Sequence, residues 1–472
     1  MQATNSPRVP ADLRRLHVLC DVVLGAGDSS DETALGDLFG HGLPVARRSV
    51  AAAITPLAVA DLEDMGVCVL RGGRVHPTVS ITECDGLIFA GDLGGDQPDQ
   101  VGGVTRAGIT LSQLTVRKET AATLDLGTGC GLQALLSAEH SAHVTAIDVN
   151  PRALRFAAFN AALNGIENVE LAQGSWLAPV RGRKFDLVVT NPPYVISPDS
   201  TFVYRDSGLP GDAISRRLVH DIPAILNEHG TGTILCNWVH GSDQPWSAPL
   251  EEWVRDIGCD ALLLHYASDD PRDYARRWNQ TTADRDPGVY DECEYYQERG
   301  IEAIASGAVV LRRRDGHNWV HTLTGAEAPT GPAGEQIQRL FAGHDHPVGE
   351  EGLLRESFAL VEGHSVEQTL SYRGGEYANH PAIVRTRPGL GANAEIDPRA
   401  VHLLLACDGT STLGQIIERV AERVSMPRET LTPLAVSTFR TLLDRGLLEF
   451  TAGDTHVARV GSGLPEPAGA RT

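Results

Sequence analysis

The sequence has 472 residues, a length that corresponds to about two to four domains. Hydrophobic residues make up 42% of it and charged residues 21%. This composition is typical of a soluble globular protein and excludes a mainly disordered or fibrous chain. The formal net charge of -21 argues against a surface that binds phosphate backbones throughout, although it leaves room for a local basic groove.

The eight cysteines are scattered, with no CxxC pair and no zinc-finger spacing to histidine. This pattern argues against a disulfide-stabilised scaffold and against a structural zinc site. No apolar run approaches the ~18 residues that span a bilayer, and His17 and Asp21 interrupt the stretch 16–25, which makes it a poor signal peptide. The histidines of 344–346 have no third ligand nearby, so we favour a solvated loop there. We therefore expect a cytoplasmic protein with no membrane span and no metal centre.

The first predicted domain, residues 1–95, has the pattern of a small winged helix. Helical spacing of apolar residues over 50–65 is followed by the apolar run 67–70, a double-glycine turn and a further apolar residue. A helix followed by a hairpin is typical of a winged helix. One or two short strands are expected within 78–90, before a linker at 92–103 that is rich in Gly, Asp, Gln and Pro.

Strand and helix patterns alternate in the second predicted domain, residues 96–315. The expected strands end at or span 124–126, 143–148, 169–172, 185–190, 233–239 and 308–311, and the expected helices are 132–140, 151–164 and 213–228. Such alternation is typical of an α/β fold in which helices cover both faces of a parallel sheet. Residues 269–300 are rich in charged and aromatic residues. We expect a surface insertion there, whose aromatic side chains either form a lid or partner contact or anchor it to the core.

The third predicted domain covers residues 316–472. Two or three helices over 400–450 end in the string 442–450, which is similar to residues 62–70 of the first domain. Both strings look like the last helix and first wing strand of a winged helix. Because neither helix carries a basic cluster, we favour a protein-contact or structural role for these modules over nucleic-acid binding. The last ~20 residues are expected to be a frayed tail.

A glycine-rich turn, Asp125-Leu126-Gly127-Thr128-Gly129-Cys130-Gly131, lies between a predicted strand and a helix. Glycines permit a tight turn that leaves room for a ligand, and the following helix offers free N–H groups. The spacing is GxGxG, which differs from the GxGxxG of dinucleotide sites. Seventeen residues after Gly131, Asp148 ends the next strand, where a carboxylate can accept both hydroxyls of a ribose. A glycine-rich turn alone could simply be a turn, but this combination predicts a site for a nucleoside cofactor.

A second motif, Asn191-Pro192-Pro193-Tyr194, follows a buried strand at the same edge of the predicted sheet. The two prolines fix the backbone and remove two donors, so we expect the carbonyls there to be free of local hydrogen bonds. The Asn191 side-chain oxygen and the Pro192 carbonyl can then accept both hydrogens of a planar NH2 group and aim its lone pair at an electrophile. Tyr194 could stack on the flat amide or base. The alternative is a rigid turn at the end of a strand.

The order of the motifs along the chain resembles that of a class I S-adenosylmethionine-dependent methyltransferase. The motifs are the glycine-rich turn, Asp148, Gly174-Ser175-Trp176 and the NPPY motif. The chain is similar in particular to the HemK/PrmC group, which methylates the glutamine amide of translation release factors; adenine-N6 methyltransferases share the NPPY motif. The resemblance covers roughly residues 100–315. It implies a Rossmann-like core with an antiparallel last strand, S-adenosylmethionine as cofactor and S-adenosylhomocysteine as product.

The resemblance also implies a role for each motif residue. Gly127, Thr128, Gly129, Cys130 and Gly131 would hold the methionine part of the cofactor, Asp125 would support their turn, Asp148 would hold the ribose, and Ser175 and Trp176 would flank the adenine. Asn191, Pro192, Pro193 and Tyr194 would hold the methyl acceptor, and Asn191 would also be a cofactor-binding residue. Asn150 would cap the helix that begins at Pro151.

Two classes of methyl acceptor remain open. The acidic net charge favours a protein over a polyanion, because nucleic-acid enzymes usually show a basic stripe. We therefore favour a glutamine side-chain amide of a release factor or another translation protein, with adenine-N6 methylation of rRNA, tRNA or DNA as the alternative. A regulator that binds the cofactor without catalysis is disfavoured by the intact NPPY motif. A positive rim around that motif would favour adenine, and a neutral or acidic rim would favour the amide.

Overall fold

The computed structural model describes most of the chain. The described residues are 7–10, 18–19, 34–94, 97–198, 203, 205–206, 208–279, 287–324, 328–345, 349–374 and 376–451. The tail expected at the end of the chain, His346, and the stretch 16–25 apart from residues 18–19 lie outside them. The chain divides into two compact units, Met1–Glu335 with Pro388–Ala392, and Gln336–Arg387 with Asn393–Thr472. The predicted divisions after residues 95 and 315 remain predictions.

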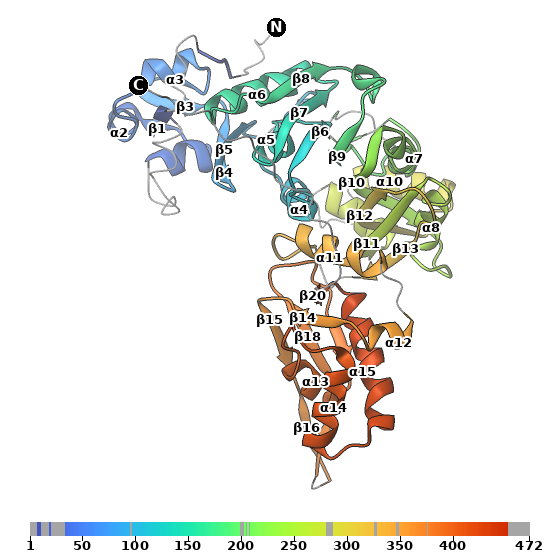
Figure 1. The fold of residues 1–472 in the computed structure, drawn as a ribbon. Coiled ribbons are helices and arrows are strands. Elements are labelled where there is room, and N and C mark those ends of the chain that lie inside the picture. Colours follow the sequence, from blue (N-terminus) through green and yellow to red (C-terminus); the bar gives the residue numbers. More distant parts are fainter. Residues whose placement is uncertain are drawn as a thin grey trace, which may run out of the picture. The chain divides into compact units, whose positions relative to one another are not determined.

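An eight-stranded sheet lies at the centre of the first unit (Figure 1). Its order is β13-β11-β12-β10-β9-β6-β7-β8. The strands are β6 (Thr120–Leu126), β7 (Ser141–Asp148), β8 (Val169–Gln173), β9 (Phe185–Thr190), β10 (Leu226–His240), β11 (Cys259–Asp269), β12 (Ala303–Arg313) and β13 (Val320–Thr324). Strand β12 is antiparallel to both neighbours, and the other pairs are parallel. The predicted α/β fold with a mostly parallel sheet and one antiparallel strand is confirmed. The antiparallel strand, predicted to be the last, is β12 and is followed by β13, and neither β11 nor β13 was anticipated from the sequence.

Helices cover both faces of the sheet. Successive side chains of a strand point to opposite faces, so neighbouring residues of β7 belong to different apolar clusters. Val144 and Ala146 of β7 join a buried apolar cluster with helices α5 (Leu132–Ala138) and α6 (Pro151–Leu163). The next residue, Ile147, belongs to a separate cluster. That second cluster contains helices α7 (Ala213–Asp221) and α8 (Ala248–Trp253). The remaining helices of this region are α4 (Arg106–Leu114), α9 (Pro271–Trp278) and α10 (Pro287–Glu298).

Two predicted helices are shorter than expected, and a proline explains each difference. The helix expected over 213–228 is α7 followed by a 3-10 turn, Ile222–Ile225, that contains Pro223. The helix expected over 50–65 is divided into α2 (Arg47–Ala53) and α3 (Val59–Asp64), with Pro56 between them. Proline has no N–H to donate and its ring clashes with the preceding turn, so a regular helix does not continue through it.

The N-terminal segment forms a small sheet in the order β1-β3-β2. Its strands are β1 (Val45–Ala46), β2 (Cys68–Arg71) and β3 (Arg74–Pro77), and a second hairpin joins β4 (Ser80–Cys84) to β5 (Leu87–Gly91). Arg71 pairs with Arg74, so Gly72 and Gly73 alone make the first turn, and both have positive φ, 59° and 78°. Tight hairpin turns need that conformation, which glycine adopts without strain. The winged-helix assignment of this segment remains a prediction.

Two asparagines of α6 hold strand β5 as a neighbouring strand would. Asn160 accepts a hydrogen bond from the Ala90 N–H (2.8 Å) and donates to the Ala90 carbonyl (3.0 Å). Asn164 likewise accepts a hydrogen bond from the Ile88 N–H (2.8 Å) and donates to the Ile88 carbonyl (2.7 Å). The pairing fits because residues four apart share a helix face and residues two apart share a strand edge. Asn160, which is fully buried, also donates to the Cys130 carbonyl of the glycine-rich turn (2.8 Å).

Within the segment expected to be a linker, 92–103, Asp92 is bonded to Val101. The Asp92 N–H donates to the Val101 carbonyl (2.8 Å), and the Val101 N–H donates to the Asp92 carboxylate (2.7 Å). The same carboxylate makes a bidentate ion pair with Arg152 at the start of α6, and both side chains are nearly buried. Charged groups that leave water need such partners. Asp92, and Val101 through it, are therefore fixed against α6.

The second unit contains helices and small antiparallel sheets. Its helices are α11 (Gly334–Asp345, which begins two residues before the unit), α12 (Glu350–Leu353), α13 (Val401–Leu405), α14 (Leu413–Val424) and α15 (Arg428–Leu443). Its strands are β14 (Ser357–Leu360), β15 (His364–Glu367), β16 (Leu370–Arg373), β17 (Glu376–Asn379), β18 (Ala382–Thr386), β19 (Ala394–Ile396) and β20 (Leu448–Thr451). The helices expected over 400–450 are present. Strand β20, expected to begin a wing, pairs with β14, and the winged-helix assignment here also remains a prediction.

Helix α14 shows how local sequence defines these elements. Thr412 and Gln415 form a reciprocal capping box at its start, and Ser425 ends it in the left-handed conformation. Its buried apolar residues are Leu413, Ile416, Ile417 and Val420, the spacing of one helix face. Within the described part of the chain, every helix is too short or too polar to span a bilayer.

We expect Asn160→Ala to destabilise the first unit by about 2–4 kcal/mol, because it leaves two backbone groups of Ala90 and the Cys130 carbonyl without partners in a buried place. Urea unfolding measures this change. Asn279→Ala is the matched control, since the partly buried Asn279 side chain bonds a single carbonyl, that of Ala275. Equal stability of both variants would show that Asn160 does not hold β5.

Candidate active site

The glycine-rich turn and the NPPY motif meet at the carboxyl edge of the sheet. Strands β6 and β9 are parallel neighbours, with Leu126 paired to Thr190, and the Thr190 hydroxyl donates to the Leu126 carbonyl (2.8 Å). The next residues of each strand are therefore adjacent: a Cβ placed on Gly127 would lie 3.9 Å from the Asn191 carbonyl oxygen. Ligand sites of open α/β sheets lie at this edge.

The three glycines of the turn serve different purposes. Gly127, Gly129 and Gly131 all have positive φ, at 77°, 57° and 90°, which other residues adopt only with strain. A Cβ on Gly131 would lie 2.8 Å from the Leu135 side chain and 3.2 Å from Ala157, so this glycine allows α5 and α6 to pack closely. A Cβ on Gly129 would meet nothing within 4 Å. The turn is thus open on that side, as a ligand requires.

Asp125 supports the turn from below. Its side chain is 1% exposed and accepts hydrogen bonds from the Thr128 hydroxyl (2.7 Å) and the Ala134 N–H (3.0 Å). Burial raises the pKa of this carboxyl from 3.8 to about 7, although the two hydrogen bonds act against the rise. A buried carboxylate is costly unless donors surround it. Asp125 therefore shapes the turn without facing a ligand.

Asp148 has the geometry of a ribose-binding residue. Its carboxylate accepts from the Gly129 N–H (2.9 Å) through one oxygen and from the Asn150 N–H (2.8 Å) through the other. Each oxygen keeps a lone pair for a further donor, and burial raises the pKa of the group. Asn150 caps α6, since its side chain accepts from the Arg152 N–H (2.9 Å). The open turn and this carboxylate together fit a nucleoside cofactor.

Trp176 is held by helix α7, which the sequence did not suggest. Its indole N–H donates to the Asp221 carboxylate (2.6 Å), and the Arg217 guanidinium lies over its ring, 4.2 Å from the centroid. Arg217 and Asp221 are four residues apart, so they share one helix face. The exposed Ser175 precedes it, and the Gly174 N–H donates to the Asp148 carbonyl (3.1 Å). Both residues thus follow β8 at the edge that carries Asp148.

The NPPY motif differs from expectation at one carbonyl. Pro192 was expected to have a carbonyl free of local hydrogen bonds, but this is wrong, because the Tyr194 N–H donates to it at 2.8 Å. The prolines remove their own donors and not the donor two residues later. A carbonyl oxygen has two lone pairs, so one remains. The Asn191 side chain is bonded to no group of the described residues, which leaves its amide free to bind a ligand.

The insertion anchors the segment that follows the motif. The Tyr274 hydroxyl accepts from the Ile196 N–H (3.1 Å) and from the Asn237 amide (2.7 Å). The Tyr296 hydroxyl donates to the Ile196 carbonyl (2.8 Å). Tyr274 and Tyr296 are 0% and 1% exposed, whereas Tyr290 is 68% exposed. For the two buried tyrosines the anchoring interpretation is therefore correct.

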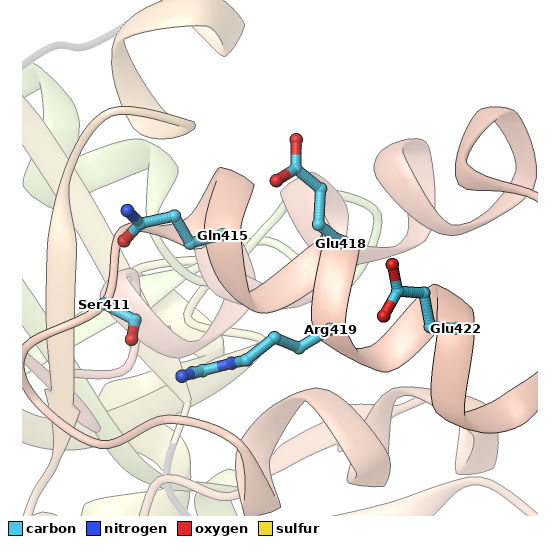
Figure 2. A pocket seen from close by; sticks show the side chains of 5 residues that line it. All are labelled: Ser411, Gln415, Glu418, Arg419 and Glu422. Carbon is cyan, nitrogen blue, oxygen red and sulfur yellow. The ribbon is translucent and has the colours of Figure 1, made fainter.

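Two other kinds of candidate site were a metal centre and a surface hollow. Among the described residues, no group of three His, Cys, Asp or Glu side chains could hold a metal ion. A hollow on α14 is lined by Ser411, Gln415, Glu418, Arg419 and Glu422 (Figure 2). In this hollow Arg419 pairs with Asp408 (3.1 Å), and Glu418 pairs with Arg428 (3.0 Å). Arg419 and Glu418 therefore already have charged partners within the unit.

We expect Asp125→Asn to change how stability depends on pH. Between about pH 4 and 7 the unfolded chain has lost the Asp125 proton that the folded chain still binds, so this group makes stability fall as pH rises, and its effect is constant above pH 7. The asparagine variant has no such proton. Urea unfolding should show it gaining about 3 kcal/mol relative to the unmodified protein between pH 5 and pH 8. The same difference at both pH values would show that folded Asp125 is ionised throughout.

Comparisons with known proteins match this region. The model of the methyltransferase small domain family matches residues 106–243. The chain is 33% identical over 168 residues to a release factor glutamine methyltransferase of Vibrio cholerae, which is 31% of this chain and 54% of that protein. It is 34% identical over 142 residues to a ribosomal protein uL3 glutamine methyltransferase of Bradyrhizobium diazoefficiens, 27% of this chain and 44% of the relative.

A shorter match is closer in sequence. The chain is 46% identical over 93 residues to a release factor glutamine methyltransferase of Deinococcus radiodurans, 19% of this chain and 32% of that protein. The chain spans about half or less of the length of these curated relatives. The matched region, residues 106–243, contains both the glycine-rich turn and the NPPY motif, which the sheet brings together. Residues 106–243 therefore match the methyltransferase small domain family, and this region is similar to glutamine methyltransferases of release factors and of ribosomal protein uL3.

Proposed function

We propose that the protein is an S-adenosylmethionine-dependent N-methyltransferase whose methyl acceptor is the glutamine side-chain amide of a translation protein. The observation that carries the proposal is the free Asn191 amide beside the open glycine turn, with one lone pair of the Pro192 carbonyl also available. The relatives named above support it, since their names assign them glutamine in a release factor or in ribosomal protein uL3.

The cofactor-binding part of the proposal assigns one group to each part of S-adenosylmethionine, which supplies an electrophilic methyl group when bound. The turn from Gly127 to Gly131 would hold the methionine portion, and Asp148 would accept the ribose hydroxyls through its two remaining lone pairs. The ring of Trp176 would lie beside the adenine with Ser175. The Trp176 indole N–H is not available for the base, because Asp221 already accepts it.

The methyl-accepting part needs positioning more than proton transfer. Asn191 and Pro192 would accept the two N–H groups of the substrate amide and hold its nitrogen lone pair toward the methyl group. Tyr194 is partly buried, and burial raises the pKa of its hydroxyl to about 12. It therefore stays protonated near neutral pH and serves as a flat packing surface, not as a base.

Charges near the motif support a protein substrate over a polyanion. Arg205 pairs with Asp206 (2.8 Å), Arg217 pairs with Asp221 (3.4 Å), and Arg277 pairs with Asp269. Each carboxylate offsets part of the charge of its arginine and so weakens the attraction for phosphates. Adenine-N6 methylation, the alternative, would call for unpaired basic residues at this rim.

We expect Asn191→Ala to abolish methyl transfer while cofactor affinity stays nearly unchanged, because the side chain contacts the substrate nitrogen and not the cofactor-binding residues. Methyl-labelled S-adenosylmethionine and an extract from cells without this gene provide the assay, and the product is divided between protease and nuclease. Label lost to protease supports the proposal, and label lost to nuclease supports the adenine alternative. Asn279→Ala is the control, and full turnover by Asn191→Ala would exclude the assigned role.

We expect Asp148→Ala to weaken cofactor binding by about 1.5–3 kcal/mol, the scale of hydrogen bonds to a charged group. Calorimetric titration with S-adenosylhomocysteine measures this loss. Glu139→Gln, an exposed change at the end of α5, should leave the affinity unchanged. An unaltered dissociation constant for Asp148→Ala would contradict the ribose assignment.

A further inference from the structure

Strand β11 contains an irregularity at the edge where the site lies. Its pairing with β12 matches His265 to Gly307 and Ala267 to Ser306, so Tyr266 between them is an extra residue, a β-bulge. Because β12 is antiparallel to both β11 and β10, strand β11 runs in the same direction as β10 and β9. Its carboxyl end therefore lies at the same edge as the NPPY motif (Figure 1). Bulges near active sites often turn a side chain in a new direction.

The sheet is shaped to accept this bulge. A Cβ on Gly307 would lie 1.9 Å from the Leu264 carbonyl oxygen and 3.0 Å from the ring of Trp238. No other residue fits there without moving the strands, since real Cβ atoms do not approach backbone so closely. Glycine at 307 thus permits β11 to approach β12 closely just before Tyr266. The close packing of the two strands beside the bulge therefore depends on glycine at this position.

The Tyr266 hydroxyl is buried and has no hydrogen-bond partner in the structure. Buried polar groups are nearly always bonded, so an exception calls for a ligand or another explanation. Burial raises the pKa of this hydroxyl well above 10, and Cys236 and Tyr194 are the ionisable groups that add to the rise. Tyr194 belongs to the NPPY motif, so Tyr266 lies within electrostatic reach of the site that we assign to the methyl acceptor.

Tyr274 provides a contrast within the same region. Tyr274 is fully buried and, like Tyr266, lies within reach of Tyr194, but the Tyr274 hydroxyl bonds the Ile196 N–H and the Asn237 amide. Its role is therefore structural. Tyr266 lacks such bonds, and its hydroxyl remains a donor at every pH near neutrality.

We propose that the Tyr266 hydroxyl donates a hydrogen bond to the carbonyl oxygen of the substrate amide and so helps to select a glutamine side chain. This inference rests on the proposed function. When Asn191 and Pro192 take both N–H groups of a planar amide, the amide oxygen is left without a partner among these residues. A buried carbonyl without a donor is costly, and Tyr266 is a buried donor without an acceptor. Each group would satisfy the other.

The test is Tyr266→Phe in the full chain, which keeps the ring and removes only the hydroxyl. Methyl transfer is measured with labelled S-adenosylmethionine and, as substrates, a release factor and ribosomal protein uL3 prepared from cells without their methyltransferases. We expect KM for the protein substrate to rise about tenfold, the effect of one lost hydrogen bond. The affinity for S-adenosylhomocysteine should not change. Tyr290→Phe, on the exposed tyrosine of the insertion, is the control and should behave like the unmodified protein.

Thermal unfolding distinguishes this role from a structural one. A structural hydroxyl lowers Tm when removed, whereas removal of a buried, unbonded hydroxyl should raise Tm by about 2 °C. A lower Tm together with an unchanged KM would overturn the inference while leaving the proposed function in place. Failure of the unmodified protein to label either protein substrate, or labelling of RNA or DNA instead, would overturn the proposed function, and the inference with it.

Discussion

The parallel pairing of β6 with β9 is the constraint on which the site depends. The turn that would hold the cofactor and the motif that would hold the substrate are more than sixty residues apart in the chain, and only this register makes them adjacent. A shift of the pairing by one residue would move every side chain of β9 to the opposite face of the sheet. The two motifs would then no longer lie side by side. The Thr190 hydroxyl, bonded to the Leu126 carbonyl, fixes this register at the last residue before both motifs.

Much of this site was predictable because its signals are local. A glycine-rich turn between strand and helix, an acid at the end of the next strand and a double proline after an apolar strand each carry their own geometry. The predicted positions of Asp125, Asp148 and Asn150 agree with the contacts observed for them. The α/β alternation was equally readable, since strands buried on both faces are continuous apolar runs. Prolines 56 and 223 were visible in the sequence as well, and the helices predicted across them were wrong.

The remaining features depend on contacts between distant segments. Nothing near Asn160 indicates that its amide would bond β5, and nothing near Tyr274 indicates that its hydroxyl would hold Ile196. The hydrogen bond to the Pro192 carbonyl was missed for another reason: the donor loss of the prolines was considered without the N–H of Tyr194. Strand β11 was missed because its pairing partner, β12, lies beyond the whole insertion. Such pairings follow from tertiary packing, which local patterns do not encode.

Asn160 links the β4–β5 hairpin to the glycine-rich turn that would hold the cofactor. One amide group bonds both Ala90 of β5 and the Cys130 carbonyl of the glycine-rich turn. A ligand that fixes the turn in place therefore also fixes the amide on which the docking of β5 depends. A partner that displaced β5 would remove the Ala90 partners of this amide, and the Cys130 carbonyl of the turn would then be bonded to a side chain that is no longer held from both sides.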